Sequence, residues 1–141
     1  AHAQAAVAAG AAFLVTPIFD PETVRWCAAR SVVTAVGCMT PSEACHAHRL
    51  GATFIKLFPA EIGGPAQVKA MLAPLPFLRI IPTGGVTAAS AGAFLEAGCT
   101  AVAAGSAVVS EELARTARWG EITRRARALV DAVASEQGGS S

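Results

Sequence analysis

The sequence predicts an α/β fold in which helices cover a parallel sheet. Short β-branched runs alternate along the chain with alanine-rich segments of helical length. A glycine recurs just before strand-like runs, at Gly10, Gly51 and Gly98, where each is expected to end a helix. Strict alternation implies parallel strands in a barrel or a doubly wound sheet, and repeats of about 20–25 residues favour the barrel.

The expected elements follow from periodicity and from helix capping signals. Apolar residues throughout the strand-like runs are typical of a sheet covered on both faces. Asp20-Pro21, a capping box from Thr40 to Glu43 with Pro41 at its first helical position, and Thr87 mark three helix starts. We expect strands near residues 12–16, 32–36, 53–58, 78–82 and 100–105, with helices near 21–29, 41–50, 64–73 and 88–97.

The end of the chain predicts one further helix. Residues from about Glu121 to Val133 carry an apolar stripe, with three arginines largely on a solvated face. Residues 136–141, which end in Gly-Gly-Ser-Ser, are expected to form a flexible tail, and residues 1–135 a single domain. A complete eightfold barrel needs about 250 residues, so a barrel domain of this length would be partial.

Composition narrows the classes of function. The 11 basic residues are nearly balanced by 10 acidic ones, which gives a net charge of +1 and no electrostatic footprint for nucleic acid. The longest uncharged run, Ala3 to Phe19, contains Gly10, Thr16 and Pro17 and is expected neither to cross a membrane nor to act as a signal peptide. The first residue is not Met, which suggests a processed or partial chain.

Four cysteines at irregular spacings, without a C-x-x-C pair, predict reduced and packed thiols in an intracellular protein. Cys45, His46 and His48 lie close together in the sequence. One helical turn can bring only Cys45 and His48 to the same face, and the remaining ligands of a zinc site are absent. No metal site is therefore predicted.

Lys56 is one of two lysines and lies within a predicted strand, whereas Lys69 lies in a helical segment and is expected at the surface. Strand alternation places Phe54, Lys56 and Phe58 on one face, where the ammonium group would point into an aromatic-flanked interior. A lysine that burial keeps partly neutral can attack a ketone and form an imine, which acts as an electron sink when the adjacent C–C bond breaks. From position alone, a lysine that reaches solvent or pairs with Glu61 is an equally good interpretation.

Two glycine-containing segments follow predicted strands and are candidate anion sites. Pro82-Thr83-Gly84-Gly85 follows one strand, and Gly105-Ser106 follows the next. Paired glycines let backbone N–H groups approach an anion closely, and in a parallel barrel these two loops are neighbours. Each could be an ordinary βα turn, but their order after Lys56 favours a phosphate site.

In three segments the chain resembles the aldolases that act on 2-keto-3-deoxy-6-phosphogluconate (KDPG) and 4-hydroxy-2-oxoglutarate. The segments are Phe54-Ile55-Lys56-Leu57-Phe58-Pro59-Ala60-Glu61, Pro82-Thr83-Gly84-Gly85-Val86 and Gly105-Ser106, in this order. The resemblance implies a TIM-type (β/α)8 barrel, of which this chain holds about the last five βα units. It also implies a class I aldolase that uses a Schiff-base lysine and no cofactor.

The resemblance assigns a role to each matching position. Lys56 would form the imine with pyruvate or with the 2-keto group of the sugar acid. Substrate-binding positions would be Thr83, Phe58 and Pro17, and phosphate-binding positions would be Gly84, Gly85, Gly105 and Ser106. The implied partners are a small phosphorylated 2-keto sugar acid and pyruvate, with no nucleic acid or membrane. The full-length protein is expected to be a homotrimer in the cytoplasm, or in a plastid for a photosynthetic eukaryote.

The chain departs from the family pattern in two places. Ile18 stands where bacterial members often carry glycine. The family's acid/base glutamate, a nearby arginine and a Gly-Thr loop belong to earlier strands that this sequence does not contain, and Glu61 is not expected to replace the glutamate. Two alternatives therefore stay open: a non-catalytic phosphate-binding or oligomerising remnant, and a sister aldolase acting on the galactonate epimer or on 4-hydroxy-2-oxoglutarate.

Overall fold

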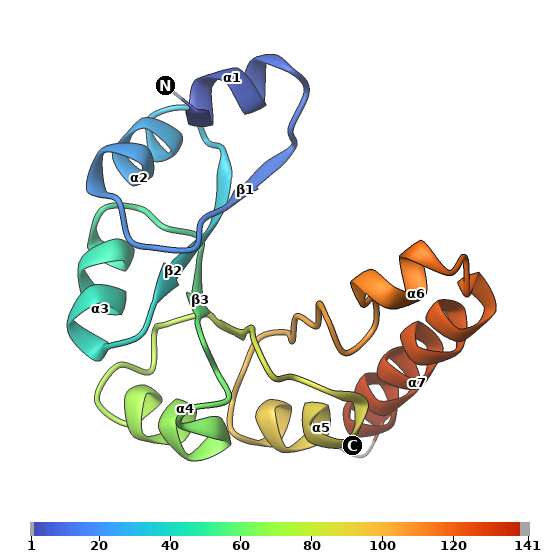
Figure 1. Ribbon diagram of the computed structural model, residues 1–141. Coiled ribbons are helices and arrows are strands. Elements are labelled where there is room, and N and C mark those ends of the chain that lie inside the picture. Colours follow the sequence, from blue (N-terminus) through green and yellow to red (C-terminus); the bar gives the residue numbers. More distant parts are fainter. Residues whose placement is uncertain (1, 139–141) are drawn as a thin grey trace.

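The computed structural model describes residues 2–138, which curve into an open half-barrel (Figure 1). Four parallel strands form one sheet in the order β1 (Phe13–Val15), β2 (Val33–Cys38), β3 (Phe54–Leu57) and β4 (Ile80–Pro82). Along the outside of the curve lie α2 (Pro21–Ala28), α3 (Pro41–Arg49), α4 (Gly64–Leu72) and α5 (Ala88–Glu96). The remaining helices are α1 (His2–Ala8), α6 (Glu111–Arg115) and α7 (Trp119–Gly138).

The expected alternation of parallel strands and helices is confirmed for the first four strands, but the fifth strand, expected at 100–105, is wrong. Only an isolated bridge joins Ala103 to Thr83. The backbone N–H groups of Thr100 and Ala103 donate to the carbonyl groups of Ile80 (2.9 Å) and Pro82 (3.0 Å). From the first of these bonds to the second, β4 advances by two residues, from Ile80 to Pro82, whereas the opposite segment advances by three, from Thr100 to Ala103. The extra residue breaks the regular strand register, as in a β-bulge.

Helix starts occur at the expected capping residues. The Asp20 carboxylate accepts from two backbone N–H groups in the first turn of α2. The Thr40 hydroxyl accepts from the Glu43 N–H (3.3 Å), and the Glu43 carboxylate accepts from the Thr40 N–H (2.9 Å), which completes a capping box. Thr87 caps α5 in the same way. Local side-chain chemistry therefore sets where the helices begin.

The glycine signals at the other end of the helices are also confirmed. Gly10, Gly51 and Gly98 have φ angles of 98°, 96° and 102°. Glycine adopts this left-handed conformation without the steric cost that a Cβ atom imposes. Each of these residues follows a helix and turns the chain toward the next strand or strand-like segment.

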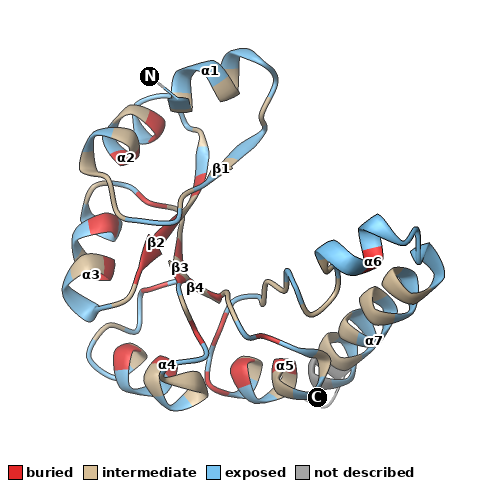
Figure 2. Ribbon diagram, viewed as in Figure 1, coloured by how far each residue is buried: buried red, intermediate tan, exposed pale blue. Residues whose placement is uncertain are grey.

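The core lies between the sheet and the outer helices (Figure 2). In β3, Ile55 and Leu57 are 1% and 0% exposed, while the alternate residues Phe54 and Lys56 are only partly buried. The helices contribute buried residues that face this side of the sheet, including Val24, Ala44, Ala47, Val68, Met71 and Phe94. The convex face of the sheet is therefore the packed face.

The concave face of the sheet is much less covered. Phe13 and Val15 of β1 are 61% and 53% exposed, and Val33 of β2 is 41% exposed. In Figure 1, a wide gap separates the α1 end of the curve from α6. Within residues 2–138, no helix combines the length and the apolar character needed to cross a membrane.

Helix α7 is longer than the sequence indicates. It extends through Gly138 rather than ending near Val133, so residues 136–138 of the expected tail are helical. Residues 139–141 lie outside the described part of the chain. Near its start, Glu121 accepts hydrogen bonds from Arg124 and Arg125, and Arg125 also reaches the carbonyl oxygen of Ala107 (3.5 Å). The Arg125 contact with Ala107 joins α7 to the loop before α6.

Candidate active site

Lys56 lies in the middle of the concave face. Its strand, β3, runs between β2 and β4, and the residues paired with Lys56 are Gly37 and Ile81. The side chain points away from the packed core, as the alternation of β3 predicts, and it is partly exposed rather than fully buried. Its Nζ atom lies 4.7 Å from the centre of the Phe58 ring, close enough for a cation–π contact.

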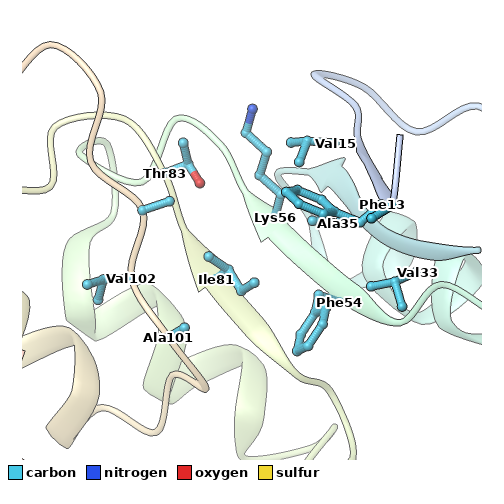
Figure 3. A pocket seen from close by; sticks show the side chains of 12 residues that line it. Phe13, Val15, Val33, Ala35, Phe54, Lys56, Ile81, Thr83, Ala101 and Val102 are labelled. Carbon is cyan, nitrogen blue, oxygen red and sulfur yellow. The ribbon is translucent and has the colours of Figure 1, made fainter. Parts of the chain in front are cut away.

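A cavity of about 510 Å³ occupies the concave face around Lys56 (Figure 3). Lys56 and Thr83 are the two polar side chains among the twelve residues that line it. Figure 3 shows both reaching toward the same end of the cavity, beyond Ile81 and Phe54. The apolar lining residues are Ala12, Phe13, Val15, Val33, Ala35, Phe54, Ile81, Ala101, Val102 and Ala103.

The backbone of Thr83 is held from both sides. Its N–H donates to the Leu57 carbonyl (2.9 Å), and its own carbonyl accepts from the Ala60 N–H (2.8 Å). A bridge to Ala103 fixes its other edge. Within the described part of the chain, the Thr83 hydroxyl makes no hydrogen bond of its own, so it is available to a ligand beside the Lys56 amine.

The Gly84-Gly85 turn packs against the segment that follows β3. Both glycines adopt left-handed φ angles, 90° and 72°. A Cβ atom added to Gly84 would lie 3.2 Å from the Phe58 ring, and one added to Gly85 would lie 2.4 Å from Cβ of Glu61. Glu61 therefore lies against the glycine turn. Among the described residues Lys56 forms no ion pair, so the alternative pairing with Glu61 is not observed.

Gly105 and Ser106 lie at the same end of the sheet as the glycine turn. Thr83, the residue before Gly84, is bridged to Ala103, two residues before Gly105. The carbonyl group of Gly105 accepts from two later backbone N–H groups, and both Gly105 and Ser106 are exposed. A Cβ atom at Gly105 would meet nothing within 4 Å. The two predicted anion loops are therefore neighbours with open space beside one of them.

The remaining candidates lie beside the cavity rather than in its lining. Phe58 contacts Lys56 through its ring and is 39% exposed. Pro17 is exposed in the β1–α2 loop, and its backbone lies against Gly37. Lys69 is exposed on α4, as expected. The apolar lining of the concave face was not predicted from the sequence. The alternation of side chains that places Lys56 on this face of β3 also applies to β1, β2 and β4 and could have predicted it.

The cysteines lie away from this cavity. Cys27, Cys38 and Cys99 are buried, as expected, and burial raises the pKa of the Cys38 and Cys99 thiols to about 12. Cys45 is partly exposed on α3. His46 and His48, near Cys45, contact the rings of Phe19 and Phe77. Residues 2–138 contain no cluster of three potential metal ligands.

Comparison with known proteins identifies related sequences. The 2-dehydro-3-deoxy-phosphogluconate aldolases of Pseudomonas aeruginosa and Haemophilus influenzae are each 33% identical, over 94% and 91% of this chain. A probable 2-dehydro-3-deoxy-6-phosphogalactonate aldolase of Rhizobium meliloti is 31% identical over 92% of the chain. The chain spans 61%, 61% and 60% of the lengths of these three relatives.

Solved structures and a family model agree with these relatives. A structure described as native KDPGal matches 97% of this chain and 65% of its own, with a TM-score of 0.88 and 28% identity. The KDPG aldolase of Legionella pneumophila, with pyruvate captured as a covalent carbinolamine, matches 88% of this chain and 60% of its own, with a TM-score of 0.73 and 27% identity. The family model described as KDPG and KHG aldolase matches residues 1–125. The chain therefore belongs to the KDPG and KHG aldolase family.

Proposed function

We propose that this chain supplies the imine-forming lysine and the phosphate loops of a class I aldolase that cleaves KDPG to pyruvate and glyceraldehyde 3-phosphate. The observation that carries the proposal is the placement of Lys56 and Thr83 together in an otherwise apolar cavity. An amine in such a cavity is partly shielded from water, which favours imine formation over simple hydration. The covalent pyruvate adduct of the Legionella pneumophila relative supports the same chemistry.

The proposed reaction begins at the 2-keto carbon. The neutral Lys56 amine adds to this carbon to give a carbinolamine, which takes up a proton from solvent and loses water to give a protonated imine. When the bond between C3 and C4 breaks, its electron pair moves into the imine to form an enamine, and C4 leaves as the aldehyde of glyceraldehyde 3-phosphate. Protonation of the enamine and addition of water then release pyruvate and regenerate the amine.

The substrate-binding roles follow from the positions around Lys56. We propose that the Thr83 hydroxyl binds the pyruvyl carboxylate, that Phe58 packs beside the imine and that Pro17 borders the bound substrate on the β2 side of Lys56. Backbone N–H groups in the two neighbouring loops would bind the phosphate; the loop residues are Gly84, Gly85, Gly105 and Ser106. The C4 hydroxyl also needs a base. No carboxylate among the described residues lines the cavity, so we assign this role to none of them.

Reductive trapping tests the proposal. Pyruvate and borohydride should leave a reduced adduct on Lys56, located by mass spectrometry of peptides from the chain. Lys56→Ala should abolish the adduct, while the exposed Lys69→Ala should serve as the matched control and retain it. An adduct on Lys69, or none on the wild-type chain, would overturn the assignment.

A second candidate function is cleavage of the galactonate epimer. It is favoured by the Rhizobium meliloti relative and by the KDPGal structure, whose TM-score of 0.88 exceeds that of the Legionella pneumophila enzyme. The two sugar acids differ in configuration at a carbon that Lys56 does not attack, so trapping with pyruvate cannot separate them. The substrates can be separated by comparing kcat/KM for the two epimers and for 4-hydroxy-2-oxoglutarate with the complete enzyme.

A non-catalytic remnant would behave differently in the same assays. It would form the pyruvate adduct slowly, because Lys56 and Thr83 are present, but it would release no pyruvate from the sugar acid above the background rate. Release of pyruvate, followed by coupled reduction to lactate, therefore separates an enzyme from a remnant. Turnover by the chain alone would mean that one of its own residues acts as the base.

We also propose that the complete barrel is a homotrimer. One structural neighbour, 29% identical with a TM-score of 0.86, is a cage designed by fusing symmetric oligomeric domains, which supports an oligomeric state for this family's barrel. Sedimentation velocity of the full-length protein would measure the number of subunits. A monomer at micromolar concentration would contradict the proposal.

A further inference from the structure

Gly37 occupies a position where a side chain would enter the Lys56 cavity. It is paired with Lys56 across the β2–β3 ladder. Val33 and Ala35, on the same strand, line the cavity, so alternation directs position 37 to the concave face as well. The backbone of Gly37 is buried on this open face, even though Gly37 has no side chain that could shield it from solvent. Another part of the chain must therefore cover it.

The covering group is the peptide between Pro17 and Ile18. A Cβ atom added to Gly37 would lie 2.3 Å from both the carbonyl carbon and the carbonyl oxygen of Pro17, and 2.7 Å from the Ile18 nitrogen. Gly37 does not have a left-handed φ angle, so backbone conformation does not require glycine here. The requirement is space, because the β1–α2 loop fills the volume beside Lys56.

Thr16 holds this loop in place. Its N–H donates to the Ala35 carbonyl (3.0 Å), which extends the β1–β2 pairing by one residue. Its hydroxyl accepts from the Gly37 N–H (3.2 Å) and donates to the Ile18 carbonyl (2.8 Å). One hydroxyl thus uses its donor and an acceptor site to tie the Ile18 carbonyl, which directly follows the Pro17–Ile18 peptide, to the strand next to Lys56.

We propose that Thr16 and Gly37 are positioning residues that hold the Pro17–Ile18 peptide as the β2-side wall of the Lys56 site. The opposite wall lies at the end of β4, where Thr83 is two residues beyond Ile81, the other residue paired with Lys56. A keto acid bound at Lys56 lies between these two walls, and the distance between them sets how well the ketone is held near Nζ. This inference rests on the proposed function.

The hydroxyl is tested with a conservative pair of variants. Thr16→Val keeps the shape and removes both hydrogen bonds, so the pyruvate concentration that gives half-maximal trapping at Lys56 should rise about three- to tenfold. Thr16→Ser should restore it to within about twofold. The control is Thr123→Val, which removes a similar bond to the Trp119 carbonyl (3.0 Å) on α7 and should change nothing.

Gly37→Ala tests the space requirement. The added methyl group must displace the Pro17–Ile18 peptide, so trapping should fall at least tenfold while the helical circular dichroism signal is kept. The control is Gly120→Ala, because a Cβ atom at Gly120 meets nothing within 4 Å. Wild-type trapping kinetics in both Thr16→Val and Gly37→Ala would overturn the inference.

Two further measurements separate the possible failures. A purely structural role for Thr16 would lower the maximum labelled fraction together with the melting temperature, with no change in the half-maximal pyruvate concentration, and would overturn the inference. If the wild-type chain is not labelled, the proposed function fails. The loop is then judged by amide exchange at Gly37, which Thr16→Val should accelerate; unchanged exchange would overturn the inference independently.

Discussion

The two faces of the sheet differ in what they contribute. On the convex face Ile55 and Leu57 are 1% and 0% exposed beneath the helices, whereas on the concave face Phe13 is 61% exposed and Lys56 borders a cavity. Adjacent residues of one strand thus serve different purposes. Stability comes from the convex face, where burial of each large aliphatic side chain contributes about 1.5–3 kcal/mol, and the concave face holds the proposed imine site.

The exposed concave face also distinguishes the sheet of this chain from most parallel sheets. Such sheets are usually covered on both faces, because their crossover helices and neighbouring strands leave little of the sheet exposed. Here the concave face keeps apolar residues exposed at β1, on an edge strand whose backbone groups are open to pairing. The concave surface is therefore suited both to a ligand at Lys56 and to further strands at its edge.

The largest expected effect on stability is at Leu57, on the convex face, compared with its neighbour Lys56 on the concave face. Leu57→Ala should lower the free energy of unfolding by about 2–5 kcal/mol, because it leaves a cavity in the packed face. Lys56→Ala should change it by less than about 0.5 kcal/mol, as expected for a partly exposed position. Urea unfolding followed by circular dichroism measures both. Equal losses would mean that the concave face is packed as tightly as the convex one.

A smaller effect is expected at two threonines. Thr40→Ala removes the hydroxyl of the α3 capping box and should cost about 1 kcal/mol of stability. Thr83→Ala removes a hydroxyl that has no partner among the described residues, so its stability should stay within about 0.5 kcal/mol of the wild type. The same denaturation experiment applies. A larger loss at Thr83 than at Thr40 would reverse the proposed division between the faces.

The sequence predicted local features well. Capping by Thr40 and the helix ends at Gly51 and Gly98 depend on residues within one turn, so their signals survive without knowledge of the fold. The alternation of Phe54 and Lys56 against Ile55 and Leu57 was predicted for the same reason. The order of Lys56 and the glycine loops then pointed to the family resemblance.

Features that depend on distant contacts were not predicted. The missing fifth strand results from a one-residue mismatch between β4 and residues 100–103, which periodicity cannot detect. Gly37 carries no signal of its own, because the group that requires its small size is the Pro17–Ile18 peptide, which lies about 20 residues earlier in the chain. The roles of Pro17, Thr83 and the phosphate loops remain predictions, since geometry alone does not identify a ligand.

A third substitution addresses the exposed apolar edge. Phe13→Thr keeps a residue suited to strands and should change stability by no more than about 0.5–1 kcal/mol, since the side chain is 61% exposed. Self-association of the chain, measured by sedimentation velocity, should decrease because an apolar group is removed from an open edge. Unchanged association together with a large loss of stability would mean that Phe13 is a core residue.

The smallest effect concerns pH and the outer helix α7. Hydrogen bonds from Arg124 and then Arg125 lower the pKa of the Glu121 carboxyl from 4.5 to about 2. Because the folded-state pKa is lowered, the stabilisation is present above pH 4.5 and is lost as the pH falls toward 2. Thermal unfolding of wild type and Glu121→Gln between pH 6 and 2.5 should converge at low pH, with a small difference because Arg124 is exposed to solvent. A difference that grows on acidification would contradict this assignment.

The extra residue between Thr100 and Ala103 affects more than strand formation. In a regular strand alternate side chains face one side, yet Ala101, Val102 and Ala103 all line the cavity. A shift of one residue reverses the face of every later side chain. Deleting one residue here would restore the regular register with β4 and move Gly105-Ser106 by one position relative to the Gly84-Gly85 turn, so the approach of the two loops depends on chain length as well as on side-chain identity.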